Sequence, residues 1–351
     1  MNLHCDFGNT GLRVPKVVFG ATALGNMFVA MSDTAKADLI REWFRCMPKP
    51  VAIDSAGKYG AGMSLEVIRR ELLALEIDPA DVIISNKLAW RRTPLTTPEP
   101  TFELGIWKDI HHDAVQDISY EGILRCHEDG CKMLGEYPPQ LVSVHDPDEY
   151  LDAATDLDDR KQRLTDIVGA YKALEELRDA GQVAAVGLGA KNWQTIRELD
   201  DHCQLDWVMM ANSFTIMNHP PELVQLIQSL ASRKVAVINS AVMQGGFLVG
   251  SDFYNYRPID PSDPVDASRL LWRQRFTELC AEHDQKPFNV AVAFGVSHPG
   301  ITSVALSTSR PERVEAMVTA ATEKMPAEIW EAMVKEKLID HDYASANLLM
   351  T

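Results

Sequence analysis

This 351-residue sequence lacks the main features of membrane, secreted and nucleic-acid-binding proteins. No stretch approaches the roughly 18 consecutive apolar residues that a transmembrane helix requires. The first residues contain no basic segment followed by an apolar core, so we expect no secretory signal peptide. The chain has 34 Lys and Arg against 50 Asp and Glu, a net charge of −16, which argues against binding nucleic acid or an anionic membrane.

Paired cysteines are also lacking. The six cysteines are scattered, and no two form a Cys-x-x-Cys motif. This pattern predicts reduced thiols in a cytoplasmic protein and not a disulfide framework. His111 and His112 are adjacent and so rarely bind one ion, while Asp156, Asp158 and Asp159 lack the Gly and Glu positions of a calcium loop. We therefore predict no metal site.

The chain does contain a repeated alternation of apolar runs and helical patterns. The runs are almost continuous in apolar residues, which is typical of parallel strands that helices cover on both faces. Eight strand–helix units predict an α/β protein with a closed (β/α)8 TIM barrel, in a single domain over residues 1–351. The eight predicted strands lie within Val17–Leu24, Val51–Ala56, Val82–Ala89, Leu141–Asp146, Val183–Ala190, Trp207–Phe214, Val235–Val242 and Ile301–Thr308.

Three further segments bear on the architecture. An open doubly wound sheet is the alternative fold, but its usual Gly-x-Gly-x-x-Gly is absent from Phe19–Gly25, after the first strand. Phe7–Val14 contains a Gly-Asn-Thr-Gly turn and predicts an N-terminal β-hairpin that closes the barrel floor. The connections Trp90–Tyr120 and Gly250–Ala267 are long rim loops, which we expect on the C-terminal face where barrel active sites form.

Four residues suited to proton transfer stand at the ends of successive predicted strands. Asp54 and Lys87 end neighbouring strands and are expected to pair, because an isolated buried charge is costly. A lysine ammonium beside Tyr59 would stabilise the phenolate, and His145 can donate a hydrogen bond to a substrate oxygen. Tyr59 can then exchange a proton with an alcohol or a carbonyl group. No side chain accepts a hydride, so a nicotinamide cofactor is implied.

These residues and several flanking segments resemble the aldo-keto reductase superfamily, whose members carry an Asp–Tyr–Lys–His tetrad on a (β/α)8 barrel. The supporting segments are Phe19–Gly25, Ala173–Val183 and Ser297–Val304, and the likeness runs from about Gly8 to about Val318. The segment Leu141–Tyr150 resembles the branch of sugar and pyridoxal dehydrogenases that includes D-threo-aldose 1-dehydrogenase, or L-fucose dehydrogenase.

The resemblance implies a role for each of the four residues. Tyr59 is the acid/base, Asp54 and Lys87 tune it, and His145 orients the substrate. The implied reaction is the NAD(P)-dependent oxidation of an aldose, L-fucose or a similar sugar, at C1 to a lactone.

The resemblance also implies a nucleotide site. The loop after the seventh strand is similar to the family's segment around the pyrophosphate, and the segment after the eighth strand is similar to the one that holds the adenosine 2′-phosphate. Arginine suits phosphate, so we expect NADP, with NAD possible. The expected cofactor-binding residues are Ala21, Thr22, Asn239, Ser240, Gln244, Gly245, Phe247, Ser309, Arg310 and Arg313.

Several positions depart from the family pattern. The Ser-Asn pair after the fifth strand is Gly189-Ala190, and the strand-six glutamine is Ala211. The tyrosine that stacks on the nicotinamide corresponds to Asn239, and the asparagine at the adenine corresponds to Met317. These departures concern the cofactor contacts and leave the four chemically active residues unchanged.

Aromatic residues are expected to line a pocket for a small sugar or carbonyl substrate, with a place in the core as the alternative. Phe28, Trp90, Trp107 and Trp193 are the candidates, because aromatic faces suit sugar C–H surfaces. Two other functions remain open. One is the reduction of small aldehydes, ketones or keto-sugars; the other is a non-catalytic nucleotide-sensing subunit, as in the potassium-channel β-subunits of the same superfamily. No oligomeric state follows from the sequence.

Overall fold

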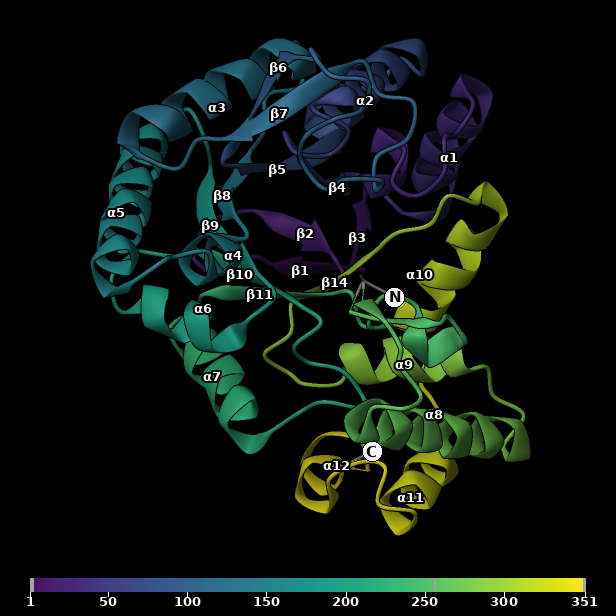
Figure 1. Cartoon of the computed structure of the whole chain (residues 1–351). Helices are drawn as coiled ribbons and strands as arrows, with labels where there is room; N and C mark the ends of the chain where they lie inside the picture. The colour runs from purple at the N-terminus through teal and green to yellow at the C-terminus, as the bar shows by residue number, and fades with distance from the viewer. Residues whose placement is uncertain (1–2, 256, 350–351) are drawn as a thin grey trace.

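The computed structural model has a closed barrel of parallel strands at its centre, as the sequence predicts (Figure 1). The structure describes residues 3–255 and 257–349, so the first two and the last two residues of the predicted domain 1–351 lie outside the described residues. The strands follow one another around the barrel in chain order, and β14 pairs with β3 to close it. The barrel strands are β3 (Val17–Gly20), β4 (Val51–Ala56), β5 (Val82–Leu88), β8 (Leu141–His145), β9 (Ala185–Ala190), β10 (Trp207–Ala211), β11 (Ala236–Ser240) and β14 (Ser303–Leu306).

Helices surround this barrel (Figure 1). None of the helices among the described residues is both long enough and apolar enough to cross a membrane. The α-helices are α1 (Asp33–Cys46), α2 (Met63–Ala74), α3 (Tyr120–Leu134), α4 (Pro147–Asp152), α5 (Leu157–Asp179), α6 (Trp193–Asp200), α7 (Pro221–Ser232), α8 (Pro264–Glu282), α9 (Pro287–Gly295), α10 (Val314–Thr322), α11 (Ala327–Lys335) and α12 (His341–Asn347). The short 3₁₀ helices are η1 (Thr22–Gly25), η2 (Pro79–Asp81), η3 (Phe247–Val249) and η4 (Pro311–Arg313).

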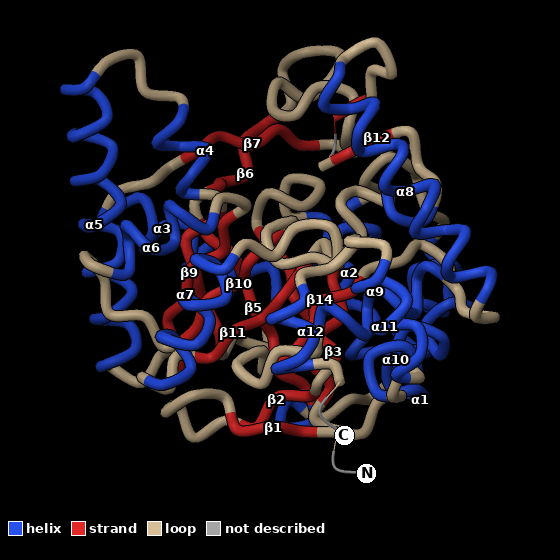
Figure 2. The backbone as a smooth tube through the Cα atoms, turned by 90° about the horizontal axis from the view of Figure 1, so that it is seen from below, coloured by secondary structure: helices blue, strands red, loops and turns tan. Residues whose placement is uncertain are grey.

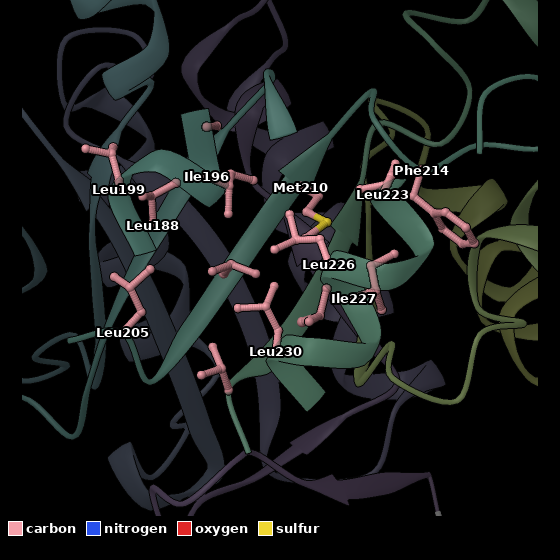
Figure 3. Close-up of a cluster of buried hydrophobic side chains, with 14 of the residues drawn as sticks. Leu188, Ile196, Leu199, Leu205, Met210, Phe214, Leu223, Leu226, Ile227 and Leu230 are labelled. Carbon is pink, nitrogen blue, oxygen red and sulfur yellow. The ribbon is translucent and has the colours of Figure 1, made fainter. Parts of the chain in front are cut away.

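The side chains of each barrel strand alternate between the helical layer and the barrel interior, because successive side chains of a strand point to opposite faces. Figure 3 shows the outer set, in which Leu188 of β9 and Met210 of β10 pack with Ile196, Leu199 and Leu226 of the covering helices. The side chains of the inner set line the barrel interior, where the site lies. The same alternation determines which residues of each strand belong to this inner set.

The N-terminal hairpin closes the floor of the barrel, as predicted. Its strands β1 (His4–Asp6) and β2 (Arg13–Pro15) are antiparallel and lie at one end of the molecule (Figure 2). Phe7 and Val14 are fully buried, and the Phe7 ring lies 6.2 Å from the Trp207 ring inside the barrel. The hairpin therefore covers the barrel at the end opposite the rim formed by the C-terminal ends of the strands.

Both long connections lie on that opposite rim (Figure 2). The first is not a plain loop: it contains the antiparallel strands β6 (Trp90–Pro94) and β7 (His112–Gln116). The second contains β12 (Phe253–Tyr254) and β13 (Arg257–Pro258) before α8 begins. The segment between β6 and β7 is fastened across the rim, because Phe28 N donates to Ile106 O at 2.8 Å and Lys108 N donates to Asn26 O at 3.0 Å.

Candidate active site

The barrel interior changes from apolar to polar between the floor and the rim. Asp54, Lys87 and His145 point inward near the ends of their strands, at even spacing from inward-facing apolar residues. Each polar residue therefore stands above an apolar layer that excludes water from below. That lower layer includes Val18, Ala52, Ile83, Leu141, Ala185, Trp207, Met209, Ala236, Ile238 and Ala305.

The structure brings the four predicted tetrad residues together. Lys87 Nζ donates to Asp54 Oδ2 at 2.5 Å, and Ser85 Oγ donates to the other carboxylate oxygen at 3.1 Å. The Lys87 ammonium lies 4.9 Å from the centroid of the Tyr59 ring. The Tyr59 and His145 rings meet edge to face, with their centroids 5.6 Å apart. The Asp54 and Lys87 side chains are each only 5% exposed, so this ion pair is shielded from water.

Two glycines of β9 leave the space that neighbouring interior side chains occupy. A Cβ atom on Gly187 would lie 2.2 Å from the Trp207 ring, so no larger residue is compatible with this packing. A Cβ atom on Gly189 would lie 3.2 Å from Cδ of Lys87, which is tighter than an ordinary contact. Gly189 thus leaves room for the lysine stem beside the cavity.

His145 is held in its neutral form. Burial, and then the positive charges of Lys58, Lys87 and Lys191, lower the pKa of His145 well below its ordinary value of 6.5. A neutral imidazole carries one N–H and one acceptor nitrogen. His145 Nε2 lies 3.6 Å from Asp146 Oδ2, whereas Nδ1 is buried without a hydrogen-bond partner among the described residues.

All four tetrad residues line one rim cavity of about 640 Å³, a size typical of small-molecule sites. One side of this cavity is formed by ionised residues, which we name the charged wall: Lys58, Glu103, Asp146, Glu149 and Lys191. None of these five residues was among the site residues predicted from the sequence. Lys58, Asp146, Glu149 and Lys191 lie within four positions of Tyr59, His145 or Ala190, near the ends of barrel strands, so charge near a strand end was a usable signal. Glu103 also lies four positions from a predicted residue, Trp107, but in a long insertion whose register cannot be predicted, so no strand end marked it.

The charged wall is tightly interconnected. Lys58, which is 3% exposed, places Nζ 2.6 Å from Glu103, 3.6 Å from Asp146 and 3.7 Å from Glu149. Lys191 Nζ lies 3.2 Å from Asp146 and also pairs with Glu149. Burial acts to lower the pKa of Lys191, but the charges of Asp146 and Glu149 outweigh it and raise that pKa. Lys191 is therefore positively charged at neutral pH.

The other side of the cavity has no charged side chain among its described residues, and we name it the uncharged wall. It is built from small hydroxyl, glycine and apolar residues at the ends of β11 and β14. Gly245 and Gly246 adopt φ values of +73° and +89°, a turn that L-residues with a side chain rarely form. The uncharged wall consists of Ser240, Ala241, Val242, Met243, Gly245, Gly246, Leu306, Ser307, Thr308 and Ser309.

Four of the predicted cofactor-binding residues line this cavity: Thr22, Ser240, Gly245 and Ser309. Thr22 Oγ1 and Ser307 Oγ are 3.0 Å apart and share a hydrogen bond across the rim. The wall thus presents hydroxyl groups and backbone, and no carboxylate that would repel an anion.

The prediction that Asn239 contacts the cofactor is corrected by strand alternation. Ser240 faces the cavity, so the preceding residue of the same strand must face the helical layer. Asn239 is fully buried there, and its Nδ2 donates to Phe214 O and Gly295 O, each at 2.9 Å. The side chain fastens the barrel to α9 and does not reach the cavity.

Three other predicted cofactor-binding residues also lie behind the cavity wall. Ala21 is fully buried, and its N–H donates to Asp54 O at 2.9 Å. Gln244 is fully buried and donates through Nε2 to the Tyr254 hydroxyl at 3.0 Å. Phe247 is fully buried with its ring 5.4 Å from the Tyr254 ring. These residues support the shape of the uncharged wall from beneath.

Arg310 and Arg313 are exposed just beyond Ser309, outside the cavity lining. Arg310 stands immediately before η4, which continues directly into α10. Met317, at the position of the family's adenine contact, belongs to α10, and its side chain is buried in the core. The two arginines therefore lie where a group extending past Ser309 would meet them.

The four predicted substrate aromatics separate into two pairs. Phe28 and Trp107 line the cavity, and the Trp107 ring lies 5.8 Å from the Tyr59 ring. Trp90 and Trp193 do not line it: Trp90 packs on Phe102, while Trp193 stacks under Arg197. Trp90 therefore fits the alternative, a place in the core, better than the predicted place in the pocket lining. Trp90 still bears on the site, because Lys58 Nζ lies 5.0 Å from the centre of its ring.

The chain is similar to known proteins over most of its length. Residues 16–337 match the model of the aldo/keto reductase family. The chain belongs to the aldo/keto reductase family. It is 25% identical over 348 residues to pyridoxal 4-dehydrogenase of Microbacterium luteolum, covering 95% of this chain and 96% of that protein. It is 26% identical over 343 residues to D-threo-aldose 1-dehydrogenase of a Pseudomonas species, covering 94% and 96%.

Solved structures give the same fold. A glycerol dehydrogenase of Gluconobacter oxydans superposes with a TM-score of 0.69 at 14% identity, covering 100% of this chain and 98% of that one. An aldo-keto reductase of Bacillus halodurans, solved in its holo form, gives a TM-score of 0.68 at 17% identity and 96% coverage of both chains. The predicted TIM barrel is thereby confirmed.

This aldo/keto reductase is an NAD(P)-dependent oxidoreductase. The uncharged wall fits such a cofactor, because hydroxyls, backbone and a glycine turn can approach a pyrophosphate closely, and none of the described residues of this wall carries a carboxylate. Within the described residues, no group of three His, Cys, Asp or Glu side chains is arranged to hold a metal ion.

Proposed function

We propose that this aldo/keto reductase oxidises an aldose at C1, L-fucose or a sugar of similar threo configuration, to its lactone, and that it prefers NADP while also accepting NAD. The observation that carries the proposal is the convergence of Asp54, Tyr59, Lys87 and His145 at one end of a cavity. The similarity to D-threo-aldose 1-dehydrogenase supports a sugar as the substrate.

In this proposal, Tyr59 takes the proton of the anomeric hydroxyl. Lys87 stabilises the phenolate oxygen of Tyr59 through its positive charge, and Asp54 holds Lys87 in place with a 2.5 Å hydrogen bond. His145, neutral and within ring contact of Tyr59, donates a hydrogen bond to the substrate oxygen and orients it. When bound, the nicotinamide cofactor accepts the C1 hydride, which leaves the C1 carbonyl of the lactone.

The uncharged wall and the two arginines beyond it are proposed to hold the cofactor. Ser240, Gly245 and Ser309 border the cavity and are close to the pyrophosphate in this arrangement. Arg310 reaches the adenosine 2′-phosphate, which NADP carries and NAD lacks. The six cysteines lie within the described residues and each is a free thiol, which supports the proposed location in the cytoplasm.

A substrate panel tests the proposal. Aldoses, small aldehydes and ketones are incubated with NAD or NADP, oxidised or reduced as the reaction requires, and the nicotinamide absorbance is followed. We expect the highest kcat/KM with a threo-configured aldose. Tyr59→Phe should lower kcat by about 10²–10⁴-fold without changing nucleotide affinity, because it removes the proton acceptor and keeps the ring. Near-normal turnover in that variant would rule out Tyr59 as the acid/base.

A further inference from the structure

We propose that the charged wall selects an uncharged polyhydroxylated substrate and rejects substrates that carry a phosphate or carboxylate group. This inference rests on the proposed sugar oxidation and assigns its specificity to side chains outside the tetrad. Glu149 and Lys191 are the specificity-determining residues that we single out, because they are the most exposed members of the wall.

The charged wall begins directly beside the reacting groups. Asp146 Oδ2 is its centre, 3.6 Å from His145 Nε2, 3.6 Å from Lys58 Nζ and 3.2 Å from Lys191 Nζ. A substrate whose reacting oxygen lies between Tyr59 and His145 therefore extends its next atoms along these carboxylates and ammonium groups.

The wall also has unused hydrogen-bonding capacity. A carboxylate offers about four acceptor positions and an ammonium group three donors. Among the described residues, the Glu149 carboxylate pairs with the two lysines of the wall, and its side chain is 48% exposed and lines the cavity, so acceptor positions remain open there. Sugar hydroxyl groups both donate and accept hydrogen bonds, and adjacent hydroxyls can bridge an alternating row of acids and bases.

Glu103 joins this polar wall to an apolar surface. One of its carboxylate oxygens lies 2.6 Å from Lys58 Nζ, and the other accepts a hydrogen bond from Trp107 Nε1 at 2.7 Å. The Trp107 ring is thereby fixed beside Tyr59, where it can cover the C–H face of a ring substrate. Polar and apolar surfaces on either side of one substrate are what an uncharged sugar requires.

The net charge of the charged wall accounts for the proposed rejection of anionic substrates. Three carboxylates face two ammonium groups, which leaves one net negative charge on the wall. Asp54 and Lys87 neutralise each other, and His145 is neutral, so the tetrad adds no compensating charge. A carboxylate or phosphate on a bound substrate would lie within a few ångströms of this negative charge, a distance at which like charges repel appreciably even near a protein surface.

Two variants of opposite charge test the inference. Glu149→Gln removes one negative charge, whereas Lys191→Gln removes one positive charge, and both keep a hydrogen-bonding side chain of similar length. Glu136→Gln is the matched control, because Glu136 also pairs with a basic residue, is 54% exposed, and lies away from the cavity. KM and kcat are measured with L-fucose, with L-galacturonate as its carboxylated counterpart of the same ring configuration, and with butanal, which has no hydroxyl groups.

We expect Glu149→Gln to raise the KM for L-fucose by about 10- to 100-fold, since a charge-assisted hydrogen bond is lost, with little change for butanal. The preference for L-fucose over galacturonate should fall in Glu149→Gln and rise in Lys191→Gln, each relative to wild type. Equal effects on L-fucose and butanal, or a shift of the galacturonate preference in the same direction in both variants, would overturn the inference while sugar oxidation stands. A wild-type enzyme that reduces butanal but oxidises no aldose would instead overturn the proposed function, and with it the polyol selectivity.

Discussion

The two walls of the cavity differ in how they can hold a ligand. The charged wall uses five ionised side chains that are ion-paired with one another and drawn from four separate segments of the chain. The uncharged wall uses short hydroxyl side chains, glycines and backbone from two adjacent strand ends, β11 and β14. Both face the same tetrad, so the difference concerns recognition and not the proton-transfer step.

The comparison indicates where charge is tolerated in this barrel. The glycine turn of the uncharged wall allows close backbone approach to a large anion, which a carboxylate there would prevent. On the charged wall, ion pairs connect the side chains, of which Lys58 and Asp146 are buried and Glu149 and Lys191 are partly exposed, and a small net charge remains for selection. Between the walls lies the Asp54–Lys87 pair, which is more deeply buried than the rim pair of Lys191 and Glu149.

The largest expected effect, on the free energy of unfolding, comes from breaking the buried Asp54–Lys87 pair. We expect Lys87→Met and Asp54→Asn, each alone, to lower the free energy of unfolding by about 3–5 kcal/mol, because each leaves one buried charge unpaired. The double variant should be more stable than either single variant, since both charges are gone. Breaking the rim pair by Lys191→Gln should cost only about 0–1 kcal/mol, because that pair is partly exposed. Chemical denaturation measures all four, and additive losses in the double variant would contradict the pairing argument.

A second test sharpens the comparison through pH. Burial, and then the charge of Asp146, raise the pKa of Asp148, which supports the charged wall from beneath, to about 6 from an ordinary 3.8. A carboxyl whose folded pKa is raised stabilises the protein below its unfolded pKa and loses that contribution as pH rises through the folded pKa. The loss between about pH 4 and pH 7 amounts to about 3 kcal/mol at most.

Asp148→Asn removes this titration while its side-chain oxygen can still accept the N–H groups of Lys191 and Asn192. The stability of the variant relative to wild type should therefore increase between pH 4 and pH 7. His145 and His219 have lowered pKa values and act in the opposite direction, but they do so equally in both proteins. Asp158→Asn, at an exposed position of α5, is the control. Parallel stability curves for Asp148→Asn and wild type would contradict the prediction.

The barrel could be predicted from the sequence because each buried strand is a continuous apolar run followed by a helical pattern. The positions of Asp54, Lys87 and His145 could be predicted for the same reason: each stands at a strand end, and the carboxyl ends of parallel strands meet on one face. Asn239 was assigned to the cofactor by resemblance alone. Its neighbour Ser240 was also assigned, although two consecutive strand residues cannot both face the interior.

The rim could be predicted only in part. Lys58 and Asp146 are adjacent to tetrad residues, so their proximity to the site was available from the sequence. Glu103 reaches Lys58 only because the segment between β6 and β7 folds back across the rim to residues 26–28. The long-range hydrogen bonds that hold this segment join backbone groups, which every residue has, so no sequence pattern indicates them. Trp90 shows the same limit, since a tryptophan after a strand is compatible with both the pocket and the core.

The smallest of the three expected effects concerns Arg310, a charged residue at the edge of the uncharged wall. Arg310 is exposed directly beyond Ser309, and it precedes the helical segment η4–α10, whose N-terminal end favours an anion. If Arg310 pairs with the adenosine 2′-phosphate, Arg310→Ala should weaken NADP binding by about 10- to 100-fold, the equivalent of one charge-assisted contact. NAD binding should hardly change, because its ribose has no phosphate there, and NAD therefore serves as the internal control. Titration of both nucleotides into wild type, Arg310→Ala and Arg313→Ala separates the contribution of each arginine. Equal losses of affinity for NAD and NADP would show that Arg310 stabilises the fold or binds the pyrophosphate. Any discrimination between the two cofactors by the uncharged wall would then not depend on Arg310.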